Sequence, residues 1–572
     1  MLRSKWLKAA PVACAALVAF GVGSAGAAAH VASHTASAAS ASSVGGKLVI
    51  DNESGSTWTC QFNPLNAADS GAGTTFALIY EPLEYVNILQ SDKAPVPMLA
   101  TGSQWSNGYK TLTFTIRKGV KWTDGVAFSA KDVVYTFDAI QSNKALDLNA
   151  LFTNAGGPLE SVTQKGADQV VFQFKSASQP YFYYVADQTP IVPQHIWSKL
   201  TQSSLETYTD TKPVGTGPYT MSSCSAQNIK YERNPNYWQS TPGHPVPRIQ
   251  EIDYPSFLSN TPANLELQQG QAQWGGQYIP NVDSFYVDQD KSTNHIWYPP
   301  VLNVSLVPNL TNPILKQLPV RQAIDYALNR HQISELGEGG EEQPGNQSGV
   351  ITPTFDSWVD SSLTEPSYDP SKSIKILEAA GWKKNSSGIF AKNGQELKFT
   401  IKSISGYTDW DADLQVITQN LKAAGIAVTA QDENSNAYTA DIQKGNFQLA
   451  YAGSGGPSAS DGPSPYYELR GLLFSGNIGS TDFSRFDSAS VDKLFNDYSA
   501  ANLAGQKKII DEIQQVMVTD LPFFPTTEGV DWYQYDTKNI GGWPTASDPY
   551  AQPSPYAFPD DEQVVDHLYP TK

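Results

Sequence analysis

The stretch TLTFTIRKGVKWTDGVAFSAKDVVYTF, residues 111–137, indicates the fold class of this chain more clearly than any other. Apolar and polar side chains alternate over residues 112–116, which predicts a strand with one buried face. Ser129 and Asp132 stand at the spacing of a capping box, in which each side chain accepts a hydrogen bond from backbone N–H groups at the start of a helix. We therefore expect a strand, a short connection and then a helix.

The same alternation of strands and helices continues on both sides of this stretch. Strands are expected where short apolar runs occur, and helices where apolar residues repeat every three or four positions between capping residues. The further strands are expected at 47–51, 170–174 and 447–451, and the helices at 320–328, 369–381 and 411–425. The chain is thus predicted to have an α/β fold.

Length and composition favour a large folded protein. At about 150 residues per domain, 572 residues suggest about four domain-sized units, or one large bilobed protein with nested subdomains. Hydrophobic residues make up 40% of the chain and aromatic residues 11%, which is enough for a large core and too much for a disordered chain.

The charge balance bears on possible partners. There are 38 lysines and arginines against 56 aspartates and glutamates, a formal net charge of −18, and no basic run. A nucleic-acid-binding protein needs a basic surface, so no nucleic-acid partner is expected. Only 16% of the residues are charged, which is low against about 25% in ordinary globular proteins. Neutral polar groups do not titrate, so such a surface suits acidic or changeable water.

The N-terminus has the pattern of an export signal. Three cations lie within the first eight residues, an apolar stretch follows at 9–20, and small residues suited to a signal peptidase follow at 23–29. The apolar stretch is too short to span a bilayer comfortably, although an uncleaved anchor is the alternative. We expect residues 1–29 to be a signal peptide and the Ala/Ser-rich residues 30–46 to be a flexible tether.

Removal of this signal leaves two cysteines, Cys60 and Cys224. In an oxidising compartment an even pair suggests one disulfide, which for so long a loop stabilises the fold by about 4 kcal/mol in the chain-entropy model. Two distant free thiols are the alternative.

No motif for catalysis, a cofactor or a metal is recognisable. A phosphate-binding loop, an H-E-x-x-H helix, a C-x-x-C pair and a G-x-S-x-G turn are all absent from the sequence, and its histidines are scattered. We therefore expect no catalytic residue, no cofactor and no metal site. The two carboxylates of a glycosidase leave no local signature, so a secreted glycoside-acting enzyme stays an alternative. A structural cell-surface protein is a further one.

A glycine-rich loop with one acidic residue directly follows the strand expected at 447–451. Glycines allow a ligand to approach backbone N–H and C=O groups, and Asp461 could bind an ammonium or a hydroxyl group. An ordinary surface loop is equally consistent with the composition. The candidate ligand-binding residues here are Tyr451, Gly453, Ser454, Gly456, Asp461 and Tyr466.

Several segments together resemble the family 5 extracellular solute-binding proteins, the oligopeptide/dipeptide-binding class of bacterial ABC importers. Each segment is weak alone, but the five stand in the order of that family and span roughly residues 47 to 535. They are residues 104–137, GTGPY at 215–219, NPNYW at 234–238, VRQAIDYALNR at 320–330, and 369–382 with its AAGW ending.

The resemblance implies a bilobed periplasmic-binding-protein fold, in which two lobes joined by a hinge close on a ligand and one lobe is built from separate segments. Lobe I would comprise residues 47–80, 212–275 and 525–572, lobe II residues 276–524, and an inserted subdomain residues 81–211.

The resemblance also suggests a ligand. In such proteins a peptide lies extended and a carboxylate holds its N-terminal ammonium, and by position that carboxylate would be Asp461. This loop departs from the aromatic-Asp-Pro pattern usual in the family. The stretch 270–280 and the GPSPY run at 462–466 instead look like the branch that binds β-linked oligosaccharides such as cellobiose.

Aromatic rings suit the C–H faces of sugars, so in that branch Trp274 would be a stacking platform. A core residue at the crossing between the lobes is the alternative interpretation of Trp274. Glu53, after the first strand, and Trp532, where the chain returns to lobe I, are further candidates for the cleft.

These observations predict a monomeric, non-enzymatic ligand-binding subunit, exported to the periplasm or to the outer face of the cytoplasmic membrane. Its partners would be an oligopeptide or oligosaccharide ligand and the membrane permease and ATPase subunits of an ABC importer.

Overall fold

The computed structural model of the chain describes residues 44–53, 57–66, 76–152, 157–239, 246–364, 366–453 and 462–572. The expected signal peptide and most of the expected tether lie outside these ranges, so both stay predictions. No helix in these ranges combines the length and the apolar character needed to cross a membrane.

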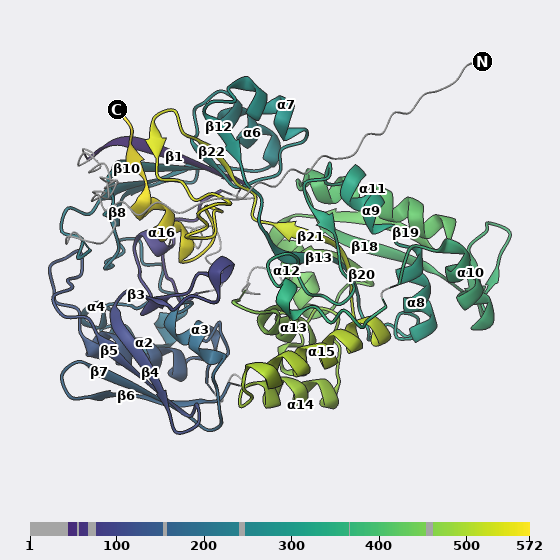
Figure 1. Cartoon of the computed structure of the whole chain (residues 1–572), viewed down its shortest axis with the longest axis horizontal. Coiled ribbons are helices and arrows are strands. Elements are labelled where there is room, and N and C mark those ends of the chain that lie inside the picture. Colours follow the sequence, from purple (N-terminus) through teal and green to yellow (C-terminus); the bar gives the residue numbers. More distant parts are fainter. Residues whose placement is uncertain are drawn as a thin grey trace, which may run out of the picture. The chain divides into compact units, whose positions relative to one another are not determined.

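Strands from distant parts of the sequence lie side by side in a seven-stranded sheet, which forms lobe I (Figure 1). β1 runs parallel to β10, while β9 and β8 continue the sheet in antiparallel fashion. In order across the sheet, the strands are β12 (Asn294–Ile296), β22 (Gln534–Asp536), β11 (Trp274–Gly275), β1 (Gly45–Glu53), β10 (Ile249–Phe257), β9 (Asn228–Arg233) and β8 (Tyr219–Cys224).

Helices α6 (Asn260–Gln268) and α16 (Asp560–His567) complete this lobe together with the short α7 (Val282–Phe285). α6 packs on β1 and β10. Aromatic side chains make up a large part of the core of this lobe, and Trp274, Tyr533 and Trp543 pack together in it. A small pair of strands, β23 (Ile540–Gly541) and β24 (Tyr569–Pro570), lies at the C-terminal end.

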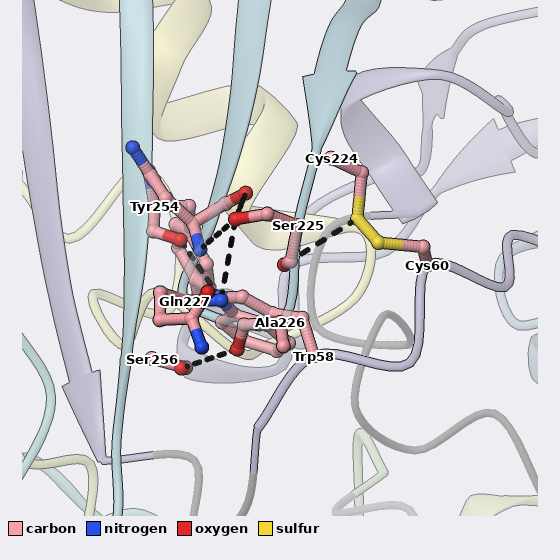
Figure 2. The surroundings of a disulfide bond; sticks show 9 residues. Trp58, Cys60, Cys224, Ser225, Ala226, Gln227, Tyr254 and Ser256 are labelled. Carbon is pink, nitrogen blue, oxygen red and sulfur yellow. Dashed lines mark hydrogen bonds between the residues drawn. A yellow bond between two sulfur atoms is a disulfide. The ribbon is translucent and has the colours of Figure 1, made fainter.

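The predicted disulfide is confirmed. Cys60 and Cys224 are bonded, with their Cα atoms 5.7 Å apart, so the segment after β1 is tied to the end of β8 (Figure 2). Trp58 reinforces this attachment, since its backbone N–H donates to Ala226 O at 3.0 Å and its indole N–H donates to Tyr254 O at 2.8 Å. The N-terminal segment is thus fixed to lobe I by a covalent bond and by hydrogen bonds.

Residues 111–137 fold as predicted. The strand is β5 and the helix is α2, and Asp132 and Ser129 form the capping box, with the Ser129 N–H donating to Asp132 Oδ2 at 2.8 Å. β5 lies inside a four-stranded antiparallel sheet that forms the inserted subdomain, and α2 packs on β6 and β7. The elements are β4 (Ala100–Ser106), β5 (Thr111–Ile116), β7 (Gln169–Phe174), β6 (Leu159–Lys165), α2 (Ala130–Ser142), α3 (Tyr181–Ala186), α4 (Gln194–Trp197), α5 (Gln202–Leu205) and the outlying pair β2 (Glu84–Tyr85) and β3 (Val96–Pro97).

A six-stranded mixed sheet forms lobe II. β18 is parallel to both β19 and β20, whereas β13 is antiparallel to its two neighbours. In order the strands are β14 (Gln343–Pro344), β21 (Phe524–Val530), β13 (Pro300–Pro308), β20 (Leu449–Gly453), β18 (Lys398–Ile404) and β19 (Ala427–Glu433), and a separate small sheet contains β15 (Lys383–Lys384), β16 (Phe390–Lys392) and β17 (Gln395–Glu396).

The helices of this lobe include the three predicted from sequence. Asp369 caps α10 as expected, accepting a hydrogen bond from the Lys372 N–H at 2.9 Å. The helix expected to start at Asp411 starts earlier, at Thr408. The helices are α8 (Leu318–Ala327), α9 (Arg330–Leu336), α10 (Pro370–Ala379), α11 (Thr408–Ala423), α12 (Ser435–Lys444), α13 (Pro465–Leu473), α14 (Ala489–Tyr498) and α15 (Leu503–Asp520).

Two short connections between β12 and β13 and between β21 and β22 join the two large sheets. They run next to each other, because the Trp297 N–H donates to Tyr533 O at 3.2 Å and the Asp531 N–H donates to Pro299 O at 2.9 Å. This corrects two expected boundaries: residues 276–296 belong with lobe I, and 525–530 belong with lobe II. The reason is strand pairing, since β12 pairs with β22 and β21 pairs with β13.

Candidate functional site

An aromatic cluster lies at the two connections. The half-buried ring of Trp532 makes edge contacts with Tyr278 and with Tyr298, at ring-centroid distances of 5.2 and 5.0 Å. The Gln534 side chain orders the cluster by donating to the Tyr298 hydroxyl at 2.8 Å and to Gln277 O at 2.9 Å. Trp532, predicted as a cleft residue, thus presents part of its ring where the lobes are joined.

Asp531 precedes Trp532 and is a buried carboxyl group that forms no ion pair with any described lysine, arginine or histidine. Only 3% of the residue is exposed, and its oxygens accept hydrogen bonds from Ser554 Oγ at 2.9 Å and Gln552 Nε2 at 3.1 Å. Burial raises the pKa of Asp531 to about 7, although both hydrogen bonds favour the ionised form. The connection back to lobe I is therefore held by a neutral or easily neutralised acid.

A larger group of buried carboxyls lies in lobe II, where the segment after α9 meets the first turns of α11. Its members are Glu338, Glu342, Asp409 and Asp413, and we call them the acid cluster. No ion pair reaches any of them in the described ranges. Nor are three such side chains arranged to hold a metal ion anywhere in the part of the chain that the structure describes.

Burial dominates the electrostatics of the acid cluster. It raises the pKa of Asp413 to about 7 and that of Asp409 to about 6, and it raises the pKa values of Glu338 and Glu342 well above their usual range. The negative neighbours add to the effect on the two glutamates. The cluster therefore holds protons at mildly acidic pH that isolated carboxyl groups would release.

Hydrogen bonds connect lobe II both to lobe I and to the inserted subdomain. The Tyr278 hydroxyl of lobe I donates to Gly337 O at 3.4 Å, immediately before Glu338. On the side of the inserted subdomain, the Tyr467 hydroxyl donates to Pro180 O at 2.9 Å. Any separation of the lobes has to break such contacts.

Two of the residues predicted to contact ligand are core residues. Trp274 has no exposed surface, its indole N–H donates to Pro553 O at 2.8 Å, and its ring packs against Trp543. Tyr466 is equally buried and stacks on Tyr498 with ring centroids 4.2 Å apart. Neither ring has a free face for a sugar, so the expectation of a stacking platform at Trp274 is corrected.

The glycine-rich loop is described only at its beginning. Tyr451 is buried in β20 and its hydroxyl hydrogen-bonds Asp413, so it supports the acid cluster rather than facing a ligand. Gly453 ends β20 and lines a small pocket with Ser305 and Ala452. The predicted ligand residues Ser454, Gly456 and Asp461 lie outside the described residues, as does the side chain of Glu53, whose backbone is the last position of β1.

Tyr298 and the acid cluster were not predicted from the sequence. A signal for the cluster exists in GEGGEE at 337–342, an acidic run without a lysine or arginine. On composition alone such a run suggests a solvated loop, and its burial depends on α11, which lies about 70 residues further along the chain.

Comparison with known proteins agrees with this architecture. The family model of the bacterial extracellular solute-binding proteins, family 5, matches residues 94–476. The oligopeptide-binding protein AppA of Bacillus subtilis is 25% identical over 524 residues, which cover 87% of this chain and 91% of AppA.

Solved structures show the same fold. A periplasmic oligopeptide-binding protein of Thermotoga maritima, crystallised with mannohexaose, superposes with a TM-score of 0.82 at 23% identity, covering 92% of this chain and 98% of that one. AppA of Bacillus subtilis in complex with a nonapeptide gives a TM-score of 0.76 at 23% identity, covering 93% and 100%. The family model matches more than half of the chain, and the fold agrees with the Thermotoga structure over 92% of it. The chain therefore belongs to the family 5 bacterial extracellular solute-binding proteins.

Proposed function

We propose that this protein is the exported, monomeric solute-binding subunit of an ABC importer, which captures a small oligomeric ligand between its two lobes and delivers it to a membrane permease with an associated ATPase. The observation that carries the proposal is the pair of adjacent connections between two sheet-based lobes, with half-buried Trp532 beside them. Such paired connections act as a hinge that lets a ligand draw the lobes together. The protein itself carries out no catalytic step.

An oligopeptide is the first ligand class. The relative AppA is an oligopeptide-binding protein, and its structure holds a nonapeptide. The peptide backbone would pair with exposed main chain of the cleft, and Asp461 would hold the N-terminal ammonium.

A β-linked oligosaccharide such as cellobiose is the second ligand class. The Thermotoga relative, although described as oligopeptide-binding, was crystallised with mannohexaose. In this chain the aromatic cluster of Tyr278, Tyr298 and Trp532 offers the kind of surface on which sugar C–H groups pack, in place of Trp274.

The test is a thermal-shift screen of mature protein with di- to hexapeptides and with cello-, manno- and xylo-oligosaccharides. A ligand present at 100 times its dissociation constant stabilises the folded state by about 2.7 kcal/mol, which is readily measured. Peptide shifts that disappear in Asp461→Asn support the first class. Sugar shifts that disappear in Trp532→Ala, with peptides inactive, support the second.

Matched controls separate binding from folding. Trp105 is also a half-buried tryptophan, but it lies in β4 of the inserted subdomain, so Trp105→Ala should leave the ligand-induced shift intact. A protein that shifts with no member of either series, or that hydrolyses chromogenic glycosides, would refute the proposed function.

A further inference from the structure

The contact between Tyr278 and Gly337 is supported by packing and hydrogen bonds on both sides. On the side of lobe I, Tyr278 is held by Asn264, whose side chain donates to Tyr278 O at 3.0 Å, and by its ring contact with Trp532. On the side of lobe II, Gly337 is pressed against α11, since a Cβ atom at this position would lie 1.7 Å from Asp413 Oδ1. Asp413 therefore packs directly against Gly337, whose carbonyl oxygen accepts the hydrogen bond from the Tyr278 hydroxyl.

Glu338 and Asp413 form a carboxyl pair directly behind this contact. The two residues are 1% and 0% exposed, and their side chains lie within hydrogen-bonding reach of each other. One oxygen on each, Glu338 Oε2 and Asp413 Oδ1, has no N–H or O–H donor. Two ionised carboxylates repel, whereas one proton between them supplies the missing donor.

In the part of the chain that the structure describes, no positively charged side chain pairs with these carboxyls in place of that proton. The groups that face the pair are the carboxyls of Glu342 on the same segment and Asp409 on α11, the hydroxyl of Tyr451 on β20, and the hydroxyl of Tyr278 from lobe I; further out lie Glu341, Asp411 and Asp283. Tyr451 donates to Asp413 and lies 3.0 Å from Thr526 Oγ1. Among the described residues, no lysine, arginine or histidine forms an ion pair with any carboxyl of this group. Asp283 is exposed, whereas Glu341 and Asp411 are half-buried.

We propose that the Glu338–Asp413 pair is a proton-dependent latch on the contact between the two lobes. With one proton shared, the pair packs closely behind Gly337 and supports the hydrogen bond from Tyr278. Without it, the paired charges separate and take up water, Gly337 shifts away from α11, and the lobes part. The consequence for cargo rests on the proposed function: ligand is held in acid and released more easily towards neutral pH.

The direction follows from the raised pKa values of the acid cluster. A carboxyl group whose pKa is higher in the closed state stabilises that state at low pH, and the stabilisation is lost as the pH rises through the closed-state pKa. For Asp413, the member of the pair on α11, that pKa is about 7, so the latch operates between roughly pH 6 and pH 8. For each proton kept only by the closed state, the closed-to-open ratio falls about tenfold per pH unit.

The test is small-angle X-ray scattering of ligand-free, mature protein at pH 5 and pH 8. We expect the radius of gyration of the wild type to increase between the two pH values. Glu338→Gln keeps the size and hydrogen-bonding capacity of the side chain but needs no shared proton, so this variant should keep the compact value at both pH values. The control Glu335→Gln changes an exposed glutamate of α9 and should respond like the wild type.

Two further variants make the outcome decisive. Asp413→Asn should act as Glu338→Gln does and replaces it if the latter fails to fold. Tyr278→Phe removes only the hydroxyl, so the radius of gyration of this variant should already be increased at pH 5. The latch would be overturned if the radius of gyration of the wild type did not change with pH. It would equally be overturned if Glu338→Gln and Asp413→Asn still expanded at pH 8. Because no ligand is present, a pH-dependent opening in a protein that binds neither peptide nor sugar would refute the proposed function and leave the latch standing.

Discussion

Replacement of Asp531 by asparagine should change how the stability of this protein depends on pH. Asp531 is buried at the connection from β21 to β22, and its carboxylate accepts hydrogen bonds from Ser554 and Gln552. No cationic side chain within the described ranges pairs with it. An asparagine side chain has nearly the same shape and can exchange hydrogen bonds with the same two partners after an amide flip. The substitution therefore removes the ionisation and little else.

The magnitude follows from the pKa of Asp531. That pKa is about 7 in the folded protein, against an ordinary value of 3.8. Because the folded-state value is raised, the stability that the protonated form provides is complete below the unfolded-state pKa and is lost as the pH rises through about 7. Between pH 5 and pH 8 the loss amounts to about 2–3 kcal/mol, which Asp531→Asn should avoid.

The assay is urea denaturation at pH 5, 6, 7 and 8, with the free energy of unfolding of the variant compared with that of the wild type at each pH. The comparison is needed because other buried carboxyls have a pKa raised to about 7 and also contribute to the pH dependence; they include Glu81, Glu84, Asp482, Glu528 and Asp560. The control is Asp432→Asn, a substitution at the exposed end of β19. Its free energy of unfolding should differ from that of the wild type by the same amount at every pH. A difference for Asp531→Asn that stays within about 0.5 kcal/mol over this range would refute the reasoning.

Three other changes have defined outcomes. Replacing Cys60 and Cys224 by serine should lower the free energy of unfolding by about 4 kcal/mol in the chain-entropy model, measured by urea denaturation, and a loss below about 1 kcal/mol would contradict it. Gly337→Ala places a Cβ atom 1.7 Å from a carboxylate oxygen of α11 and should lower the free energy of unfolding by more than about 2 kcal/mol. In the control Gly471→Ala the Cβ meets no atom closer than 3.8 Å, so the free energy of unfolding should hardly change. Trp274→Ala should cost about 3–5 kcal/mol of stability because it opens a cavity in the core; normal stability with lost sugar binding would instead restore its role as a stacking platform.

Local signals in the sequence predicted local structure well. The capping box of Ser129 and Asp132 and the cap at Asp369 were found because both depend on residues within one turn of the helix that they start. The start of α11 was placed three residues late, since the chain enters this helix without a side-chain cap and nothing in the sequence marks Thr408.

The candidate site was harder to predict because its environment is assembled from distant segments. Trp274 has the sequence context of a ligand residue, but β22, some 260 residues later, pairs with its strand and α16 follows in the same core, so the ring is covered. The acid cluster likewise requires the segment after α9, the first turns of α11 and the hydroxyl of Tyr451 to come together. Trp532 was predicted as a cleft residue because the family resemblance located the return to lobe I, and its contact with a ligand stays a prediction.

The way in which the first sheet is assembled sets an order for folding as the chain is made. Lobe II can complete its sheet from one continuous stretch, β13 to β21, whereas β1 needs β10 and then β11, and β22 is added only after every strand of lobe II. A chain made from N-terminus to C-terminus therefore carries an unfinished lobe I until β22 has been made. A truncation before Gln534 should leave lobe II folded while lobe I lacks the strand that joins β11 to β12.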